Sequence, residues 1–262
     1  QMQALADDPD LEVDHAEEAW ALHREEVDPS GATRMVRTTD LDRAFDVNNL
    51  SVPVTGDDAP PEEVAANLLI ACGVFSTGTR IDALRDWIDD DSAGPFENDH
   101  YTRLSPPARP ANRILYGWSE LMQIEGWTPD LFARKPPRLQ QGLFEAELAD
   151  CLTVIPAPRN RVSPVNINTA EPAVLQALFG FASEGIVERI VDRRRREPFR
   201  DTTFLADLLG DAEYRRVRSL LDVRSRFFRI EASAHRDQRS AQVELLAARE
   251  PDGRVSVLGA LF

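Results

Sequence analysis

The chain of 262 residues is 42% hydrophobic and 29% charged, which is typical of a globular protein with one large domain or two to three small ones. It holds no run of about 18 apolar residues, and Gln1 to Asp10 lack the basic start and apolar stretch of a signal peptide, so we expect neither a membrane span nor a targeting segment within these residues. Residues 1–100 carry 24 acidic and 6 basic residues, so their net charge is more negative than the −15 of the whole chain. An acidic surface of this kind repels phosphate backbones.

The N-terminal part is predicted to hold one helix and one strand. A weak apolar stripe favours a helix over 14–26, and the run 33–39, which follows the turn signal Pro29-Ser30-Gly31, is typical of a strand. Prolines and a glycine between 53 and 61 then mark a boundary.

Short helices are predicted for the middle of the chain. Apolar residues at helical spacing indicate helices over 61–72, 81–88, 118–124 and 129–135. After a short apolar run over 151–155, Thr169 is expected to cap a helix that begins near Pro172, and Ser183 is expected to cap the next. Two further short helices are predicted over 204–209 and 213–221.

The C-terminal part is predicted to form antiparallel strands. Apolar and polar residues alternate over 228–234 and 241–245, and the turn signal Pro251-Asp252-Gly253 precedes a third strand over 255–261. Helices therefore lie between the strand-forming parts of an α+β unit.

The sequence gives no sign of catalysis. Its histidines, His15, His23, His100 and His235, are scattered, and there is no GxSxG, no HExxH and no glycine-rich phosphate loop. We expect a non-enzymatic protein.

The acidic loop over 89–99 is the best candidate for a bound ligand. Crowded carboxylates are costly unless a cation neutralises them, and hard oxygen ligands suit calcium. Against the EF-hand spacing, His100 stands where the closing glutamate belongs, so the loop is not an EF-hand. The candidate ligands are Asp89, Asp91, Glu97, Asn98 and Asp99. The alternative is a solvated acidic loop.

The two cysteines, Cys72 and Cys151, have no CxxC partner and no histidine cluster nearby, which argues against zinc. They are either two buried thiols or one disulfide of an oxidising compartment, and the disulfide is the preferred interpretation.

A helix-hairpin-helix pattern follows Asn166-Ile167-Asn168-Thr169-Ala170. Its hairpin, residues 180–185, lacks the close glycine pair of nucleic-acid-binding modules and places Glu184 where an anion would dock. The net charge also disfavours nucleic acid, which remains the alternative function.

An ordered set of segments resembles the K-subunit family of minor pseudopilins from bacterial type II secretion systems. The matching segments are residues 40–50, 86–91, 97–101, 119–121, 165–170 and the final strands. The resemblance covers nearly the whole chain.

The resemblance implies a pilin-like α+β fold interrupted by a large helical insert of sterile-alpha-motif-like (SAM-like) units. The expected parts are an N-terminal pilin-like segment (1–58), a first SAM-like insert with the acidic metal loop (59–152), a second SAM-like unit (153–222) and C-terminal pilin-like strands (223–262). The family's apolar N-terminal helix, which anchors the subunit in the inner membrane before assembly, is expected to have been removed.

The resemblance also implies a function. Such subunits cap the tip of a periplasmic pseudopilus, bind the I and J minor pseudopilins, support assembly and engage secreted exoproteins. Calcium in the insert is a family trait, and the family's acidic loop aligns with Asp89, Asp91, Glu97 and Asp99. Asn98 and His100 depart from the family pattern, in which an acid and an aromatic residue are common.

Overall fold

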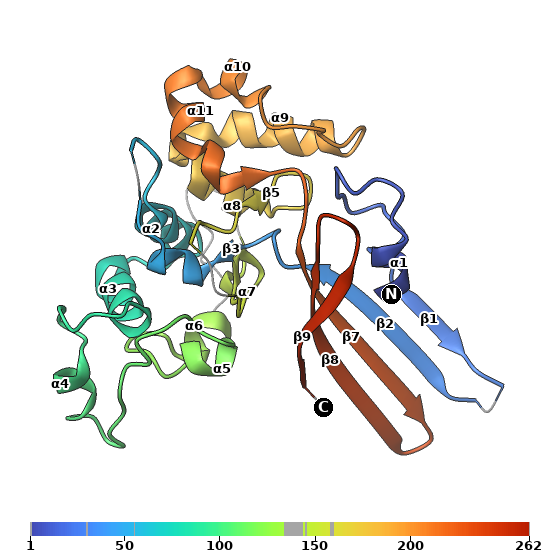
Figure 1. Cartoon of the computed structure of the whole chain (residues 1–262), viewed down its shortest axis with the longest axis horizontal. Helices are drawn as coiled ribbons and strands as arrows, with labels where there is room; N and C mark the ends of the chain where they lie inside the picture. The colour runs from blue at the N-terminus through green and yellow to red at the C-terminus, as the bar shows by residue number, and fades with distance from the viewer. Residues whose placement is uncertain are drawn as a thin grey trace.

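A five-stranded antiparallel sheet forms one part of the molecule (Figure 1). The computed structural model describes residues 2–29, 31–54, 56–133, 144, 146–157 and 160–261. The strand order is β1-β2-β7-β8-β9, with bounds Arg24–Val27, Thr33–Asp40, Phe227–Arg236, Arg239–Arg249 and Val255–Leu261. The predicted strand over 33–39 and the three C-terminal strands are therefore confirmed.

The sheet buries one face against the N-terminal residues. Alternation in β7 directs Phe228 and Ile230 to that face, where they pack with Leu5 of helix α1 (Met2–Ala6) and with Trp20. The rings of Trp20 and Phe228 meet edge to face, with centroids 5.0 Å apart. These contacts hold α1 on the sheet.

The predicted helix over 14–26 is wrong. Residues 14–23 follow an irregular path, and Arg24–Val27 pairs with β2 as an edge strand. The weak apolar stripe is overridden by two tertiary interactions. Trp20 is buried against the sheet, and the Asp14 carboxylate accepts a hydrogen bond from the Ser225 backbone N–H.

The helical insert comprises residues 41–226, between β2 and β7, and contains many short helices. Their bounds are α2 Pro61–Ala71, α3 Thr77–Ile88, α4 Asn98–Tyr101, α5 Trp118–Leu121, α6 Pro129–Ala133, α7 Leu148–Cys151, α8 Pro172–Phe179, α9 Glu184–Arg194, α10 Leu205–Leu209 and α11 Asp211–Val217. Two short parallel pairs, β3 (Phe45–Asp46) with β4 (Leu152–Thr153) and β5 (Val165–Asn166) with β6 (Leu221–Asp222), join distant segments. The predicted helices are present at these places, although residues 134 and 135 of the helix expected over 129–135 lie outside the described residues.

One hydrophobic core runs through the insert, and α2 packs on α8 within it. Buried polar residues fix its segments: the Asn48 side chain, fully buried, donates to the carbonyls of Leu115 and Ile155 at 3.0 Å and accepts from the Leu115 N–H at 2.8 Å. The division of the insert into two SAM-like units at 152/153 stays a prediction.

The predicted N-cap of α8 is wrong. Glu171 occupies the N-cap position without a side-chain hydrogen bond, and Pro172 begins the helix. The Thr169 hydroxyl instead donates to the buried carboxylate of Asp40, which needs donors because it lies away from water. Ser183 does precede α9, but its hydroxyl donates to the Gly180 carbonyl rather than capping the helix.

Candidate metal site and family

The acidic loop connects the end of α3 to the start of α4. Asp89 directly follows α3, and its backbone N–H donates to the Arg85 carbonyl at 2.9 Å. Glu97 directly precedes α4. The loop folds back between them, so that carboxylate oxygens of Asp89, Asp91 and Glu97 all lie within 4.8 Å of one another.

Burial and mutual repulsion make this group unfavourable when it is ionised. Glu97 is only 8% exposed. Burial, followed by the charges of Asp91 and Asp86, raises the pKa of Asp89. Burial and the charges of Asp86, Asp89 and Asp91 raise the pKa of Glu97. A bound cation would favour the ionised carboxylates and so lower the pKa values of both Asp89 and Glu97.

Several buried oxygens of the loop have no hydrogen-bond partner within the described part of the chain. They are Oδ1 of Asp86, Oδ1 of Asp89 and Oε1 of Glu97. An unsatisfied buried oxygen is costly, and calcium takes six to eight oxygen ligands, so this donor set fits a calcium ion.

The position of the Asp86 carboxylate explains why residue 94 of the loop is a glycine. The Asp86 carboxylate is fully buried on α3, and its Oδ2 accepts from the Phe96 N–H at 2.9 Å. A Cβ on Gly94 would lie 2.1 Å from that same Oδ2, so only glycine fits there. The loop is also held by Asn112, whose side-chain amide donates to the Asp91 carbonyl at 2.8 Å.

The structure brings together three of the five predicted ligands. Asn98 and Asp99 lie exposed in the first turn of α4, and Asp99 does not join the close group of carboxylates. Their role as ligands stays a prediction. Sequence analysis missed Asp86, which lies one helical turn before Asp89 and could have been found from that spacing.

The two cysteines meet in the core. Cys72 follows α2 and Cys151 ends α7, both are buried, and both are thiols in the structure. A hydrogen bond with Cys72, together with burial, raises the pKa of the Cys151 thiol. The raised pKa keeps Cys151 from being a reactive thiolate, and the disulfide between the two cysteines stays a prediction.

The arginines at the end of α9 make internal contacts. Arg193 lies over the rings of Phe199 and Phe204, and Arg194 donates to the Ile167 carbonyl at 2.8 Å. These two side chains stabilise the insert rather than form an open phosphate-binding surface, which weighs against the helix-hairpin-helix alternative.

Within the described residues, no helix has both the length and the apolar character needed to cross a bilayer.

Comparison with known proteins identifies the family. Two family models, both described as type II secretion system protein K, match residues 43–139 and 165–224, together more than half of the chain. The type II secretion system protein K of Aeromonas hydrophila is 27% identical over 243 residues, which cover 85% of this chain and 68% of that protein. Its Pseudomonas aeruginosa counterpart is 28% identical over 264 residues, 94% of this chain and 70% of that protein.

A solved structure supports the same conclusion for the fold. The chain is similar to one in the crystal structure of the GspK–GspI–GspJ complex from the enterotoxigenic Escherichia coli type 2 secretion system, with a TM-score of 0.73 and 20% identity. The match covers 99% of this chain and 89% of that chain, and it confirms the expected α+β fold with its helical insert. The chain belongs to the family of type II secretion system protein K.

Proposed function

We propose that this chain is a structural minor pseudopilin that caps the tip of the type II secretion pseudopilus, together with the I and J minor pseudopilins, and supports assembly and protein secretion. Family membership and the solved complex of a similar chain support this assignment. The observation that carries it is the helical insert, because it interrupts the sheet of an otherwise small pilin-like unit.

The place of the insert gives the capping role a physical basis. The chain leaves the sheet after Asp40 and returns at Phe227, and Asp40 pairs with Phe228, so both connections lie at the same end of the sheet. The insert is therefore concentrated at that end (Figure 1). Bulk at one end of a subunit prevents another subunit from stacking there, which leaves a cap.

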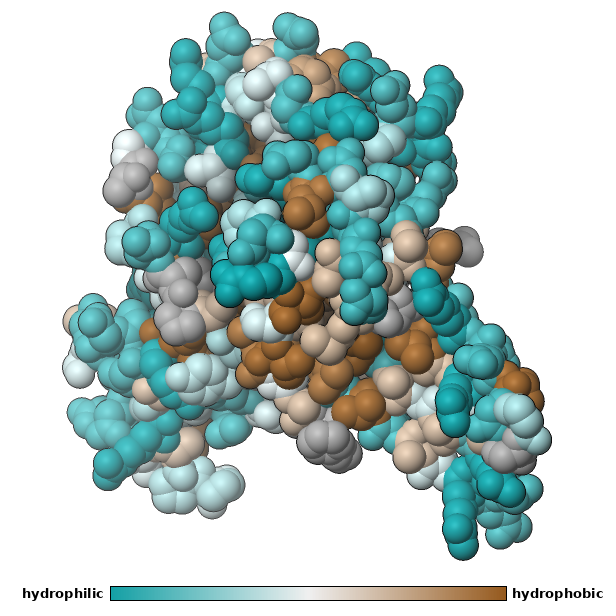
Figure 2. All heavy atoms as spheres, turned by 45° about the vertical axis from the view of Figure 1, so that its right-hand side comes forward, coloured by the Kyte–Doolittle hydropathy of each residue, from teal (hydrophilic) through white to brown (hydrophobic). Residues whose placement is uncertain are grey.

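The surface supports an assembling subunit. Figure 2 shows apolar residues gathered low in the middle of one face, with polar residues over the insert and over the far end of the sheet. In β9, Val257 and Leu258 are 48% and 41% exposed. Apolar surface rimmed by polar residues is typical of protein interfaces.

Calcium is the proposed ligand of the acidic loop. Asp89, Asp91 and Glu97 would hold the ion, and Asn98 and Asp99 are proposed to add ligands from α4. When bound, calcium supplies positive charge and cross-links its oxygen ligands. The chain's own residues position the site: Asp86 and Gly94 fix the loop, so that the end of α3 is tied to the start of α4.

The proposal includes a non-enzymatic role in the periplasm, contact with secreted exoproteins and attachment to the inner membrane before assembly. The absence of catalytic motifs supports the non-enzymatic role. The others rest on the family resemblance.

Size-exclusion chromatography with light scattering tests the proposal. The purified chain, mixed with the I and J minor pseudopilins of the same secretion system, is expected to elute with both as one ternary complex. Separate elution of the three proteins at micromolar concentration would contradict the assignment. Fluorescence anisotropy with a labelled DNA duplex at low salt is the matching control and is expected to show no binding.

A further inference from the structure

A buried arginine holds the N-terminal segment, residues 7–23, to the sheet. Arg249, at the end of β8, is 4% exposed. Its guanidinium donates to the Asp8 carboxylate at 2.9 Å, to the Asp14 carboxylate, and to the Ser225 carbonyl at 3.2 Å. It also lies over the Phe228 ring, 5.2 Å from the centroid. Such charge-assisted hydrogen bonds are strong because the groups are shielded from water.

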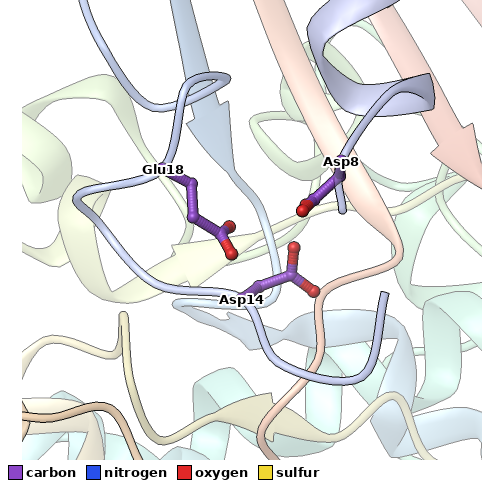
Figure 3. Close-up of side chains that lie close together, drawn as sticks. All are labelled: Asp8, Asp14 and Glu18. Atoms are coloured by element: carbon purple, nitrogen blue, oxygen red, sulfur yellow. The ribbon is translucent and has the colours of Figure 1, made fainter. Parts of the chain in front are cut away.

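A third carboxyl group faces the same place. Glu18 points toward Asp14 and Asp8 (Figure 3), and oxygens of the three groups all lie within 4.8 Å of one another. Glu18 accepts hydrogen bonds from the Trp20 indole N–H and from the His15 backbone N–H, the latter at 3.3 Å. Its side chain is 11% exposed.

The charges of this group do not balance. Among the described residues, Arg249 ion-pairs with Asp8 and Asp14, while the basic side chain that lies beside Glu18 is the part-exposed imidazole of His15, at 3.8 Å, which is charged only when protonated. Three ionised carboxylates around one guanidinium would leave two uncompensated negative charges beside the core. Burying unpaired charge is costly, so a carboxyl group takes up a proton instead.

We propose that Asp8, Asp14, Glu18 and Arg249 form a proton-dependent clasp, which holds the N-terminal segment on the sheet while Glu18 is protonated and loosens it when Glu18 ionises. Glu18 is the proton-binding member because both aspartates accept from the guanidinium and Glu18 does not. Asp40 is the next acidic group, linked to Asp14 through Ser225, whose hydroxyl donates to Asp40 and whose N–H donates to Asp14.

The protonation equilibria agree with this geometry. Burial, followed by the charges of Asp14 and Asp8, raises the pKa of Glu18 to about 8. Burial also raises the pKa of Asp14, despite Arg249, and raises the pKa of Asp40 to about 6. Since the unfolded pKa of Glu18 is 4.5, the folded state holds its proton longer, and stability falls as pH rises from 4.5 to about 8.

The clasp controls how firmly α1 is docked. Trp20 lies two residues from Glu18, donates to it and packs on Phe228, next to Leu5 of α1. Ionisation of Glu18 strengthens the indole hydrogen bond but repels the carboxylates of Asp14 and Asp8, so the repulsion acts on the segment that carries Trp20. The local environment of Trp20 should therefore change when the Glu18 carboxyl group gains or loses its proton.

The test is fluorine NMR of the chain labelled with fluorotryptophan, with the Trp20 signal assigned from a Trp20→Phe variant. Calcium is kept in excess, so that the acidic loop does not titrate. Between about pH 6 and pH 9.5, the Trp20 signal should shift with a midpoint near the pKa of about 8. Glu18→Gln should abolish this transition, while the matched control Glu17→Gln, at an exposed neighbour, and His15→Gln should keep it.

Thermal melts give an independent measurement. The melting temperature of the wild-type chain should fall between about pH 6 and pH 9 by more than that of Glu18→Gln, because Gln mimics the protonated acid. A Trp20 midpoint below about pH 6, a transition that survives in Glu18→Gln, or a transition lost in His15→Gln would overturn the proposal.

Discussion

Removing two carboxylates of the acidic loop should make the chain insensitive to calcium without weakening its calcium-free fold. The variant is Asp89→Asn with Glu97→Gln, which keeps the shape of both side chains. In the calcium-free protein, both carboxyl groups have pKa values raised above their ordinary values. Their ionisation therefore costs stability as pH rises through those values, and neutral amides remove that cost. At neutral pH the calcium-free variant should be at least as stable as the wild type.

The magnitudes follow from the geometry. Two unit charges about 4.8 Å apart repel by about 1 kcal/mol at the dielectric constant of water, and by more where burial lowers it. A ligand that binds only the folded state at about 1,000 times its Kd adds about 4 kcal/mol. For a chain of this size, each kcal/mol raises Tm by about 2–4 °C, so calcium should raise the wild-type Tm by about 10 °C.

Differential scanning fluorimetry with excess calcium and with a chelator measures both effects. The matched control is Asp90→Asn, because Asp90 is exposed in the same loop and lies outside the close group of carboxylates. The control should keep the full calcium response, and the double variant should lose it. Coincident wild-type melts with calcium and with chelator would refute the metal site. A double variant much less stable than the wild type in chelator would refute the repulsion argument.

Further predictions concern the loop glycine, a buried amide and the cysteines. Gly94→Ala should weaken calcium binding at least about tenfold by calorimetry, because its Cβ would displace the carboxylate of Asp86; unchanged affinity would contradict the close packing. Asn48→Ala should cost about 2 kcal/mol or more in urea unfolding, since it leaves the buried N–H and carbonyl of Leu115 unpaired and removes one of two donors to the Ile155 carbonyl, and a loss under 1 kcal/mol would count against their burial. Cys72 and Cys151 are thiols in this structure, and thiol titration of the denatured, non-reduced chain tests the disulfide predicted from the sequence, which would be worth about 4 kcal/mol in the chain-entropy model; the prediction expects no free thiol, and two free thiols would rule it out.

The sheet and most helices could be predicted because their signals are local. The apolar alternation predicted the strands β7 and β8, but burial follows it only at the start of β7, where Phe228 and Ile230 are buried on either side of a half-buried Arg229. Along β8, burial instead increases from the exposed Arg239 to the buried Arg249, because only one end of the strand lies against the core. The first strand could not be predicted in this way. All four residues of Arg24–Val27 are exposed, so the strand has no buried face to create alternation and is defined by backbone pairing with β2.

The hydrogen-bond partners of the buried polar side chains could not be predicted from the sequence either. The same Asn and Asp residue types occupy turns and helix caps elsewhere, so a side chain's partner depends on segments more than a hundred positions away. Thr169 is the clearest case: a credible N-cap in the sequence becomes the donor to Asp40, 129 positions earlier. Three of the candidate ligands, Asp89, Asp91 and Glu97, do lie together because they are close in sequence, and their binding of a metal stays a prediction.

The described part of the chain contains two close groups of three carboxylates, and the difference between them supports the proposal of calcium. Around Asp14, the fold supplies its own cation, Arg249, and a proton on Glu18 reduces the remaining excess from two negative charges to one. Near Asp89, Asp91 and Glu97, Arg85 lies 3.8 Å from Asp86, too far for a hydrogen bond, and its charge only partly offsets the rise in the pKa of Asp89. Carboxylate oxygens of that loop remain without donors in the described residues. Within the part of the chain that the structure describes, the fold thus supplies an ion-paired cation for the carboxylates around Asp14 but not for those of the acidic loop. This difference is expected if the loop takes its positive charge from a calcium ion in solution, and the melts with calcium and with chelator test that expectation.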